Sequence, residues 1–258
     1  MQRLKDRVSI ITGAAAGIGE GIARAMAREG ANVVLFGRHD TVKKTAKDIS
    51  DLGQKAVAFR VDVASVSEVN GAVQQVLRRF GKVDILVNNA GIYPEMLFVE
   101  MPDDVRDRVI DVNIKGVWNC TKAVILGMIK QKYGKIINVS SVTGPMVAAK
   151  GETIYSASKG AVSGFTRALA LEVAEHGINV NAICPGYIDT PGMRNSAGGM
   201  DPDEYIGKLA EGVPLGRLGS TDEVGDLAVF LASEESKYIT GAEIVIDGGN
   251  IIQEQKEY

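Results

Sequence analysis

A tyrosine and a lysine four residues apart are the pair in this sequence best suited to move a proton. Tyr155 and Lys159 stand near the start of a segment with helical periodicity, and residues four apart on a helix share one face. An ammonium group beside a phenol lowers the pKa of the tyrosine, which prepares it to exchange a proton with a carbonyl oxygen. The spacing therefore predicts a general acid, although the same pair also occurs on purely structural helices.

A glycine-rich segment supplies the second chemical signal. Residues 12–19 read TGAAAGIG, follow a short apolar run and open a helical pattern. Glycines let the backbone approach a ligand closely, and the N-terminus of a helix offers free N–H groups to a diphosphate. The spacing differs from Gly-x-Gly-x-x-Gly, and a simple turn is the alternative. We expect a phosphate cradle with contacts from Gly13, Ala15, Gly17, Ile18 and Gly19.

The end of the next apolar run bears on the choice between NAD and NADP. An acidic residue at this place would bind the adenosine 2′-hydroxyl and repel a 2′-phosphate, but the chain has Gly37 followed by Arg38. A guanidinium group pairs well with a phosphate. The pattern predicts a preference for NADPH over NADH, with a solvated loop arginine as the alternative.

The elements that must position these residues alternate between short apolar runs and longer amphipathic stretches. This alternation is typical of a parallel sheet covered by helices on both faces. The expected strands are 8–11, 33–36, 56–61, 85–88, 135–139, 179–183 and 243–246. The expected helices are 18–29, 40–52, 66–80, 103–131, 153–176, 203–211 and 222–233, several of them ending at a glycine. We therefore predict an α/β fold, a doubly wound Rossmann fold with a seven-stranded parallel sheet, as one domain over residues 1–258.

The segment from about residue 187 to 215 interrupts this rhythm, because it is rich in proline and glycine and has one short helical pattern. It follows the sixth expected strand, at the edge of the sheet where ligands bind in such folds. We expect a mobile loop that closes over a substrate, with a loop of no function as the alternative.

Composition excludes several other classes of protein. The chain has 258 residues and a formal net charge of −3, with scattered basic residues, so a nucleic-acid partner is not expected. No apolar run is long enough for a membrane span and the charged start lacks a signal peptide, which predicts a cytoplasmic protein. Cys120 and Cys184 are predicted to be buried thiols. His39 and His176, the two histidines, have no convergent ligand spacing, so no metal site is predicted.

Further motifs join these signals in one order along the chain. They are Asn88-Asn89-Ala90-Gly91, Asn113, Ser141, and Pro185-Gly186 with Thr190. Together with the glycine-rich segment and the Tyr155/Lys159 pair, they make the whole chain resemble the short-chain dehydrogenase/reductase family. Several motifs in register are far more specific than any one of them.

This resemblance implies a catalytic group of four residues: Asn113, Ser141, Tyr155 and Lys159. In it Ser141 would hold the substrate oxygen, Tyr155 would transfer the proton, and Lys159 would bind the nicotinamide ribose while tuning Tyr155. Asn113 would hold a water that links Lys159 to solvent. Ser140 competes with Ser141 for the serine role, and we favour Ser141 because it directly precedes Val-Thr-Gly. The implied cofactor contacts further along the chain are Asp62, Val63, Asn89, Ala90, Gly91, Tyr155, Lys159, Pro185, Gly186, Ile188 and Thr190.

We therefore expect an NADP(H)-dependent oxidoreductase, an alcohol dehydrogenase or carbonyl reductase acting on a small molecule. A 3-oxoacyl-[acyl-carrier-protein] reductase is an alternative: Lys132 matches one basic position for the acidic carrier, but His176 stands where a second arginine would be expected. A non-catalytic dinucleotide sensor is a third reading. The resemblance also implies a homotetramer formed through the two long helices and the last strand. Tyr93, Met146, Tyr187 and Met193 are guesses for the pocket wall.

Overall fold

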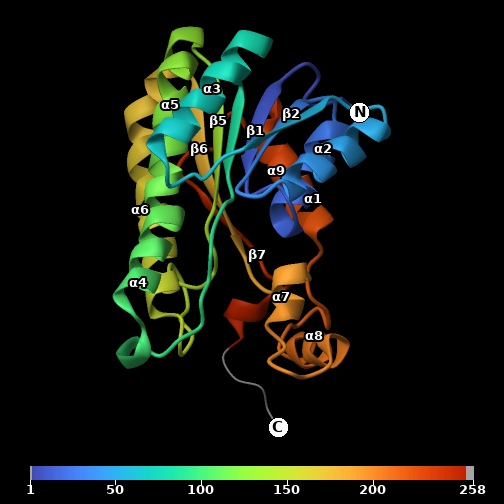
Figure 1. Ribbon diagram of the computed structural model, residues 1–258, viewed down its shortest axis with the longest axis vertical. Helices are drawn as coiled ribbons and strands as arrows, with labels where there is room; N and C mark the ends of the chain where they lie inside the picture. The colour runs from blue at the N-terminus through green and yellow to red at the C-terminus, as the bar shows by residue number, and fades with distance from the viewer. Residues whose placement is uncertain (1, 254–258) are drawn as a thin grey trace.

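A single sheet of seven parallel strands runs through the molecule. The structure is a computed structural model that describes residues 2–253; Met1 and residues 254–258 of the predicted domain lie outside the described part. The strand order is β3-β2-β1-β4-β5-β6-β7 (Figure 1). The strands are β1 (Val8–Thr12), β2 (Asn32–Gly37), β3 (Ala56–Arg60), β4 (Ile85–Asn88), β5 (Gly134–Val139), β6 (Ile178–Pro185) and β7 (Glu243–Ile246). The predicted fold class is confirmed, and the bounds of every predicted strand agree with the observed bounds to within two residues.

Helices cover both faces of this sheet, with α1, α2 and α9 on one face and α3, α5 and α6 on the other (Figure 1). Their bounds are α1 (Gly17–Arg28), α2 (Thr41–Asp51), α3 (Val66–Phe80), α4 (Asp103–Val109), α5 (Gly116–Gln131), α6 (Thr153–Val173), α7 (Pro191–Asn195), α8 (Pro202–Glu211) and α9 (Thr221–Ala232). The predicted glycine C-caps are also observed, because Gly30, Gly53, Gly81 and Gly177 all have positive φ angles.

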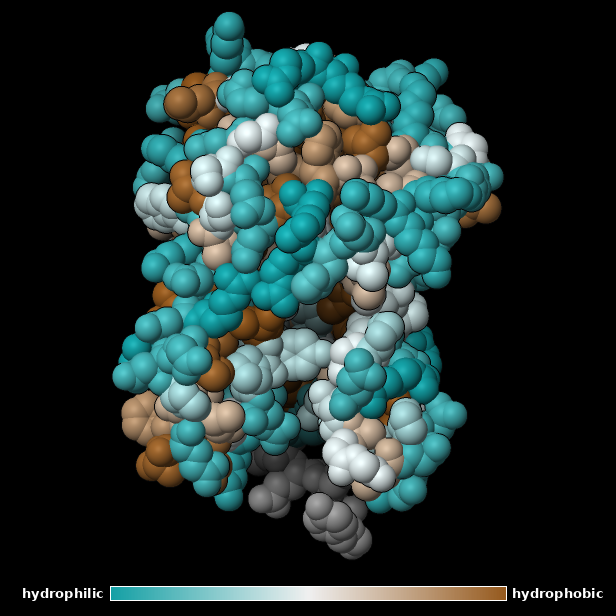
Figure 2. Space-filling model, in the orientation of Figure 1, coloured by the Kyte–Doolittle hydropathy of each residue, from teal (hydrophilic) through white to brown (hydrophobic). Residues whose placement is uncertain are grey.

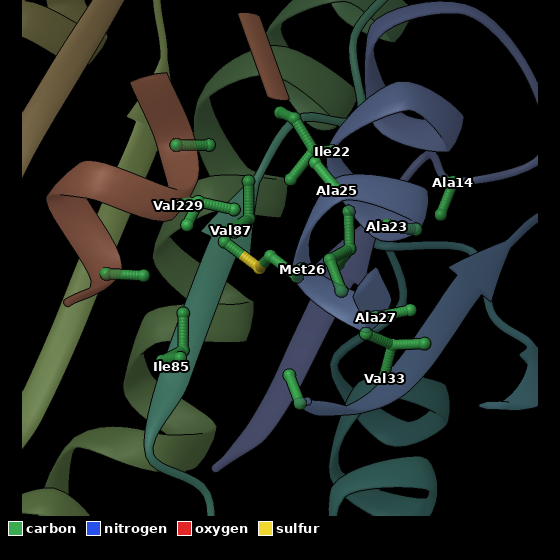
Figure 3. Close-up of a cluster of buried hydrophobic side chains, with 14 of the residues drawn as sticks. Ala14, Ile22, Ala23, Ala25, Met26, Ala27, Val33, Ile85, Val87 and Val229 are labelled. Carbon is green, nitrogen blue, oxygen red and sulfur yellow. The ribbon is translucent and has the colours of Figure 1, made fainter. Parts of the chain in front are cut away.

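Alternate residues of each central strand point into opposite layers. In β4, Ile85 and Val87 pack in the layer of α1 and α9, whereas Leu86 packs in the layer of α3 and α5. Figure 3 shows Met26 of α1 and Val229 of α9 close to Val87, with Ile85 further along the same strand. A strand buried on both faces must be apolar throughout, which explains the uninterrupted Val/Ile/Leu runs of the sequence.

The helix predicted over residues 103–131 is not one regular helix, and this part of the prediction is wrong in detail. It begins as α4, passes through a π-helical segment η2 (Ile110–Lys115) and continues as α5. A π-helical turn inserts an extra residue and often marks a functional position. Similarly, the helix predicted over residues 153–176 leaves the α-helical form at Val173 and ends with a 3-10 turn.

The segment predicted as a loop with one short helix contains two, α7 and α8. Each begins with a proline at its first position and a capping side chain before it, Thr190 and Asp201 respectively. Arg194 of α7 forms ion pairs with Asp189 (2.7 Å) and Asp203 (2.6 Å), so the two helices are tied together. Helix α7 was missed because five residues are too few for a periodic signal.

Both cysteines are buried free thiols, as predicted. Within residues 2–253, no helix is long and apolar enough to cross a membrane.

Candidate active site

The predicted site residues collect where the strand order reverses between β1 and β4. In such sheets ligands bind beyond the carboxyl ends of the strands at this reversal. Figure 2 shows the surface hollowed between the side formed by α4 and the side formed by α7 and α8. The structure therefore brings the motifs together along one edge of the sheet.

The glycine-rich segment forms a close-fitting turn between β1 and α1. Gly13 has φ +65°, and a Cβ atom there would lie 2.8 Å from the Cα atom of Ala90. A Cβ atom at Gly19 would collide with the Gly13 carbonyl oxygen and lie 2.5 Å from Nδ2 of Asn89. The residue before α1, Ala16, has no side-chain cap for the first N–H groups of the helix. Free N–H groups beside side-chain-free backbone fit a diphosphate.

Thr12 ties this turn to the turn after β4. Its Oγ1 accepts hydrogen bonds from the backbone N–H groups of Asn89 (2.9 Å) and Ala90 (3.0 Å). In return, Nδ2 of Asn89 donates to the carbonyl oxygen of Thr12 (2.9 Å). Thr12 was not among the predicted contacts; a hydroxyl directly after a buried strand was the signal that could have identified it.

The structure gives a physical reason for the missing acidic residue at the end of β2. A Cβ atom at Gly37 would lie 2.8 Å from Cβ of Val42, so the packing of α2 leaves no room for a side chain. The neighbouring Arg38 is exposed, and its Nε donates to Nε2 of His39 (3.3 Å). Arg38 is thus open to a ligand at this edge.

Tyr155 and Lys159 lie on one face of α6, next to the carboxyl end of β5. Lys159 is 6% exposed, and its Nζ donates to the carbonyl oxygen of Val139 (2.8 Å) and lies 5.6 Å from the centre of the Tyr155 ring. A Cβ atom at Gly91 would be 3.7 Å from the same Nζ. The predicted pairing of phenol and ammonium in one space is therefore observed.

The predicted direction of the Tyr155 pKa is wrong. Burial raises the pKa of Tyr155 to about 12, and hydrogen bonding with Ser141 opposes this only in part. Burial also lowers the pKa of Lys159 to about 8. Spacing alone suggested that the ammonium would lower this pKa, but removal of the phenol from water has the largest influence on it and raises it.

Ser141 and Ser140 have different surroundings, which separates the two candidates for the serine role. Ser140 Oγ donates to the carbonyl oxygen of Lys159 (3.1 Å) and lies 3.2 Å from Oγ of Ser163, inside the protein. Ser141 Oγ accepts from the N–H of Thr143 (3.1 Å) and adjoins Tyr155. Ser141 is therefore the serine with hydrogen-bonding capacity left for a ligand.

Asn113 lies in the π-helical segment η2 and is 1% exposed. Its Oδ1 accepts from the N–H of Ile92 (2.9 Å), and its Nδ2 donates to the Ile92 carbonyl oxygen (2.9 Å) and to Oγ of Ser158 (3.0 Å). Ser158 in turn donates to the carbonyl oxygen of Tyr155 (2.7 Å). Asn113 therefore joins the segment after β4 to the helix of Tyr155, through a serine that sequence reasoning missed.

The remaining predicted contacts complete the same edge. Ile188 bridges to Gly219, and Thr190 reaches the glycine turn, because a Cβ atom at Gly17 would lie 3.5 Å from its Cβ. Pro185 ends β6, and the N–H of Gly186 donates to the carbonyl oxygen of Ile246 (3.0 Å). Five further predicted contacts lie near the ends of β1, β3 and β4: Ala15, Ile18, Asp62, Val63 and Ala90.

Tyr93 connects the catalytic tyrosine with the α7–α8 segment. Its ring packs edge-on against Tyr155, with 6.2 Å between ring centres, and its hydroxyl lies against Gly192. Of the other guesses for the pocket wall, Met146 is 41% and Tyr187 38% exposed. Within residues 2–253, no three or more His, Cys, Asp or Glu side chains are grouped to hold a metal ion.

Comparison with known proteins identifies the family. A family model described as enoyl-(acyl carrier protein) reductase matches residues 13–250. Oxidoreductase UcpA of Salmonella typhimurium is 48% identical over 257 residues, covering 98% of both chains, and the 3-oxoacyl-[acyl-carrier-protein] reductase FabG of Thermotoga maritima is 40% identical over 251 residues, covering 97% of this chain and 100% of its own. The crystal structure of a putative gluconate dehydrogenase from Agrobacterium tumefaciens superposes with a TM-score of 0.90 at 34% identity, over 96% of this chain and 97% of the other. The chain belongs to the short-chain dehydrogenase/reductase family and is an oxidoreductase with a fold for a nicotinamide dinucleotide.

Proposed function

We propose that the protein is an NADP(H)-dependent oxidoreductase that interconverts a carbonyl group and an alcohol on a small molecule. The observation that carries this proposal is that Ser141, Tyr155 and Lys159 adjoin one another, and that Lys159 and Asn113 both lie beside Gly91. Bound at this edge, the cofactor supplies or accepts the hydride, and the protein supplies alignment and proton transfer.

The proton step follows from the two shifted pKa values. With a pKa of about 12, Tyr155 holds its proton at neutral pH and can donate it to a carbonyl oxygen during reduction. Ser141 keeps the substrate oxygen within reach and stabilises its developing charge. Since oxidation needs the phenolate, we expect reduction to dominate at neutral pH and oxidation to gain as the pH rises.

Cofactor binding is assigned to the residues around the two turns. Gly13 and Gly19, with the N-terminus of α1, would hold the diphosphate, and Arg38 would bind the 2′-phosphate. Ile188 and Thr190 would fix the nicotinamide from the α7 side. NADPH is favoured because Gly37 has no room for the acidic side chain that selects NAD.

The mouth of the site favours substrates without negative charge. The charges of Glu95, Glu152 and Tyr187 help to raise the pKa of Tyr205. The charge of Glu152 also helps to raise the pKa of Tyr155. Burial and the neighbouring charge of Glu95 raise the pKa of Glu152, which shows that this place disfavours a further negative charge. A neutral ketone, aldehyde or sugar is therefore a better fit than a carboxylate.

The relative FabG keeps 3-oxoacyl-[acyl-carrier-protein] reduction as the alternative. Lys132, which closes α5 in a left-handed conformation, is exposed for an acidic carrier. His176 offers a weaker positive charge than arginine at the second predicted position. The match to oxidoreductase UcpA is at higher identity than the match to FabG, 48% against 40%.

We also propose a homotetramer, on the basis of apolar side chains exposed along α5 and α6. Trp118 is 60% and Leu126 71% exposed on α5, and Leu171 is 82% exposed on α6. Trp118 packs against Phe165 with 5.9 Å between ring centres, which joins the two helices into one apolar surface. Light scattering should give a tetramer, and a monomer would contradict this proposal.

An activity screen tests the main proposal. We expect a panel of neutral ketones, aldehydes and sugars to be reduced with NADPH, at a kcat/KM higher than with NADH. A preference for NADH would contradict the cofactor assignment. Selective reduction of 3-oxoacyl-carrier substrates would favour the FabG alternative. If no compound of the panel is reduced although NADPH binds normally, a dinucleotide sensor would instead be favoured.

A further inference from the structure

The turn after β3 holds an ion pair that the sequence did not predict. Arg108, in the last turn of α4, donates from Nη2 to Oδ2 of Asp62 at 2.7 Å. Both side chains are partly buried, at 33% and 26% exposure. The other oxygen of Asp62, Oδ1, accepts from the N–H of Ala64 at 3.0 Å. The carboxylate is therefore held from two sides.

This pair lies along the proposed cofactor site. Arg108 lines a cavity of about 530 Å³ together with Gly91 and Ile92, the residues that follow the β4 turn. The positive charge of Arg38 also stabilises the Asp62 carboxylate. Burial raises the pKa of Asp62, but the N–H of Ala64 and the charges of Arg108 and Arg38 outweigh burial and hold this pKa below its ordinary value.

The charges at this edge do not by themselves favour a 2′-phosphate. Besides Asp62, the carboxylate of Glu68 lies here, since its Oε2 accepts from the N–H of Asp62 at 2.9 Å. Asp62 and Glu68 therefore bring two carboxylates to the turn after β3, where Arg38 and Arg60 are exposed. Without an ion-pair partner, the Asp62 carboxylate would attract Arg38 and repel a phosphate. Arg108 is that ion-pair partner.

We propose that Arg108 is a positioning residue for cofactor choice, and this rests on the proposed NADP(H) dependence. By pairing with Asp62, Arg108 leaves Arg38 free to bind the 2′-phosphate and removes the repulsion from the neighbouring carboxylate. Arg108 thus acts through Asp62. The same edge without this pair would favour the adenosine 2′-hydroxyl of NAD.

The test compares the binding of two cofactor fragments, 2′,5′-ADP and 5′-AMP, by isothermal titration calorimetry. For Arg108→Leu we expect the affinity for 2′,5′-ADP to fall about fivefold, while the affinity for 5′-AMP changes by less than about twofold. Because the effect is electrostatic, added salt should reduce the difference. Arg108→Lys should keep most of the wild-type preference.

A second substitution separates this role from a merely structural one. Asp62→Asn in the Arg108→Leu background should restore most of the lost preference for 2′,5′-ADP, because the unpaired carboxylate is then gone. Arg106→Leu is the matched control on the same helix. Arg106 pairs with Asp103 and Asp107, both at 2.7 Å, and its loss should leave both affinities unchanged.

The outcomes distinguish the two proposals. If the wild type binds 5′-AMP at least as tightly as 2′,5′-ADP, the NADP(H) assignment fails and this inference fails with it. If the wild type prefers 2′,5′-ADP but Arg108→Leu weakens both fragments equally, or Asp62→Asn gives no recovery, only the role of Arg108 is refuted. Circular dichroism checks that each variant is folded.

Discussion

Each end of β5 has a buried lysine beside it, but the two lysines differ in every other respect. At the carboxyl end, Lys159 of α6 donates to the carbonyl oxygen of Val139, the last residue of the strand. At the amino end, Lys135 of β5 itself donates to Oδ1 of Asn179 at 2.7 Å. The two side chains belong to residues that are only 6% and 2% exposed. Burial lowers the pKa of both lysines.

Their surroundings separate them. Lys159 lies beside the Tyr155 ring and Gly91, in the proposed site. Lys135 lies near an ionic group around Asp84, whose carboxylate accepts from the N–H of Val8 (2.8 Å) and pairs with Arg7 (3.3 Å) and Lys82 (2.8 Å). This group joins β1, β4 and β5 at the edge opposite the glycine turn.

The comparison teaches that burial and a shifted pKa do not identify a catalytic lysine. Both features are present at each end of β5, although ligands in such sheets bind beyond the carboxyl ends of the strands. A titratable partner and access to the site make the difference. We therefore expect substitutions at the carboxyl end to reduce turnover, and substitutions at the amino end to change stability alone.

The largest difference in kcat between the two ends of β5 is expected when the tyrosine at each end is replaced by phenylalanine. Tyr155→Phe should lower kcat by about 10³-fold, because the proton donor is lost, and should leave NADPH binding unchanged. Tyr133→Phe is the matched control: Tyr133 directly precedes β5, with the guanidinium of Arg7 3.9 Å above its ring. Its kcat should stay within about twofold of wild type. Near-normal turnover in Tyr155→Phe would refute the proposed mechanism.

The two lysines should differ in turnover by a somewhat smaller factor. Lys159→Met should lower kcat/KM by about 10²-fold, whereas Lys135→Met should leave it within about twofold. Since the pKa of Lys159 is about 8, we also expect the reductive kcat/KM of the wild type to fall as the pH rises through this value and the ammonium loses its proton. Lys159→Arg, if active, should lack this fall, because arginine stays protonated. A fall at the same pH in that variant would assign it to another group.

The sequence predicts the sheet well and the electrostatics poorly, for physical reasons. The central strands β1, β2 and β4 are buried on both faces and mainly apolar, and shorter apolar runs mark the other four strands. The π-helical segment around Asn113 could not be predicted, because one extra residue hardly changes the apolar periodicity of a long helix. Helix α7 is too short for any periodic signal.

Within the site, motif order placed Ser141, Tyr155 and Lys159 together, but their protonation needs the fold. Spacing gives the distance between two groups on a helix and says nothing about their removal from water, which is why the direction of the Tyr155 pKa was predicted wrongly. The Arg108–Asp62 pair joins residues 46 positions apart on different elements, and no local pattern marks it.

At the amino end, the main effect should be on stability. Asp84→Ala should lower the free energy of unfolding by about 3 kcal/mol, because it leaves the N–H of Val8 without its acceptor and two cations without their partner. Its kcat should remain within about twofold of wild type when measured well below the melting temperature. Urea denaturation and steady-state kinetics on the same preparation check this. A large loss of kcat with unchanged stability would show that the amino end serves the reaction after all.

The smallest effect concerns the pH dependence of stability at Lys135. Because burial lowers the folded-state pKa below the ordinary 10.5, folding carries a penalty that is complete below the lowered pKa and disappears as the pH rises towards 10.5. The wild type should therefore gain stability relative to Lys135→Met, by about 1 kcal/mol or less, between neutral pH and about pH 9.5. Paired urea denaturation curves at the two pH values measure this difference. A loss of relative stability over this range would mean that the ammonium at the amino end of β5 is stabilised by the fold.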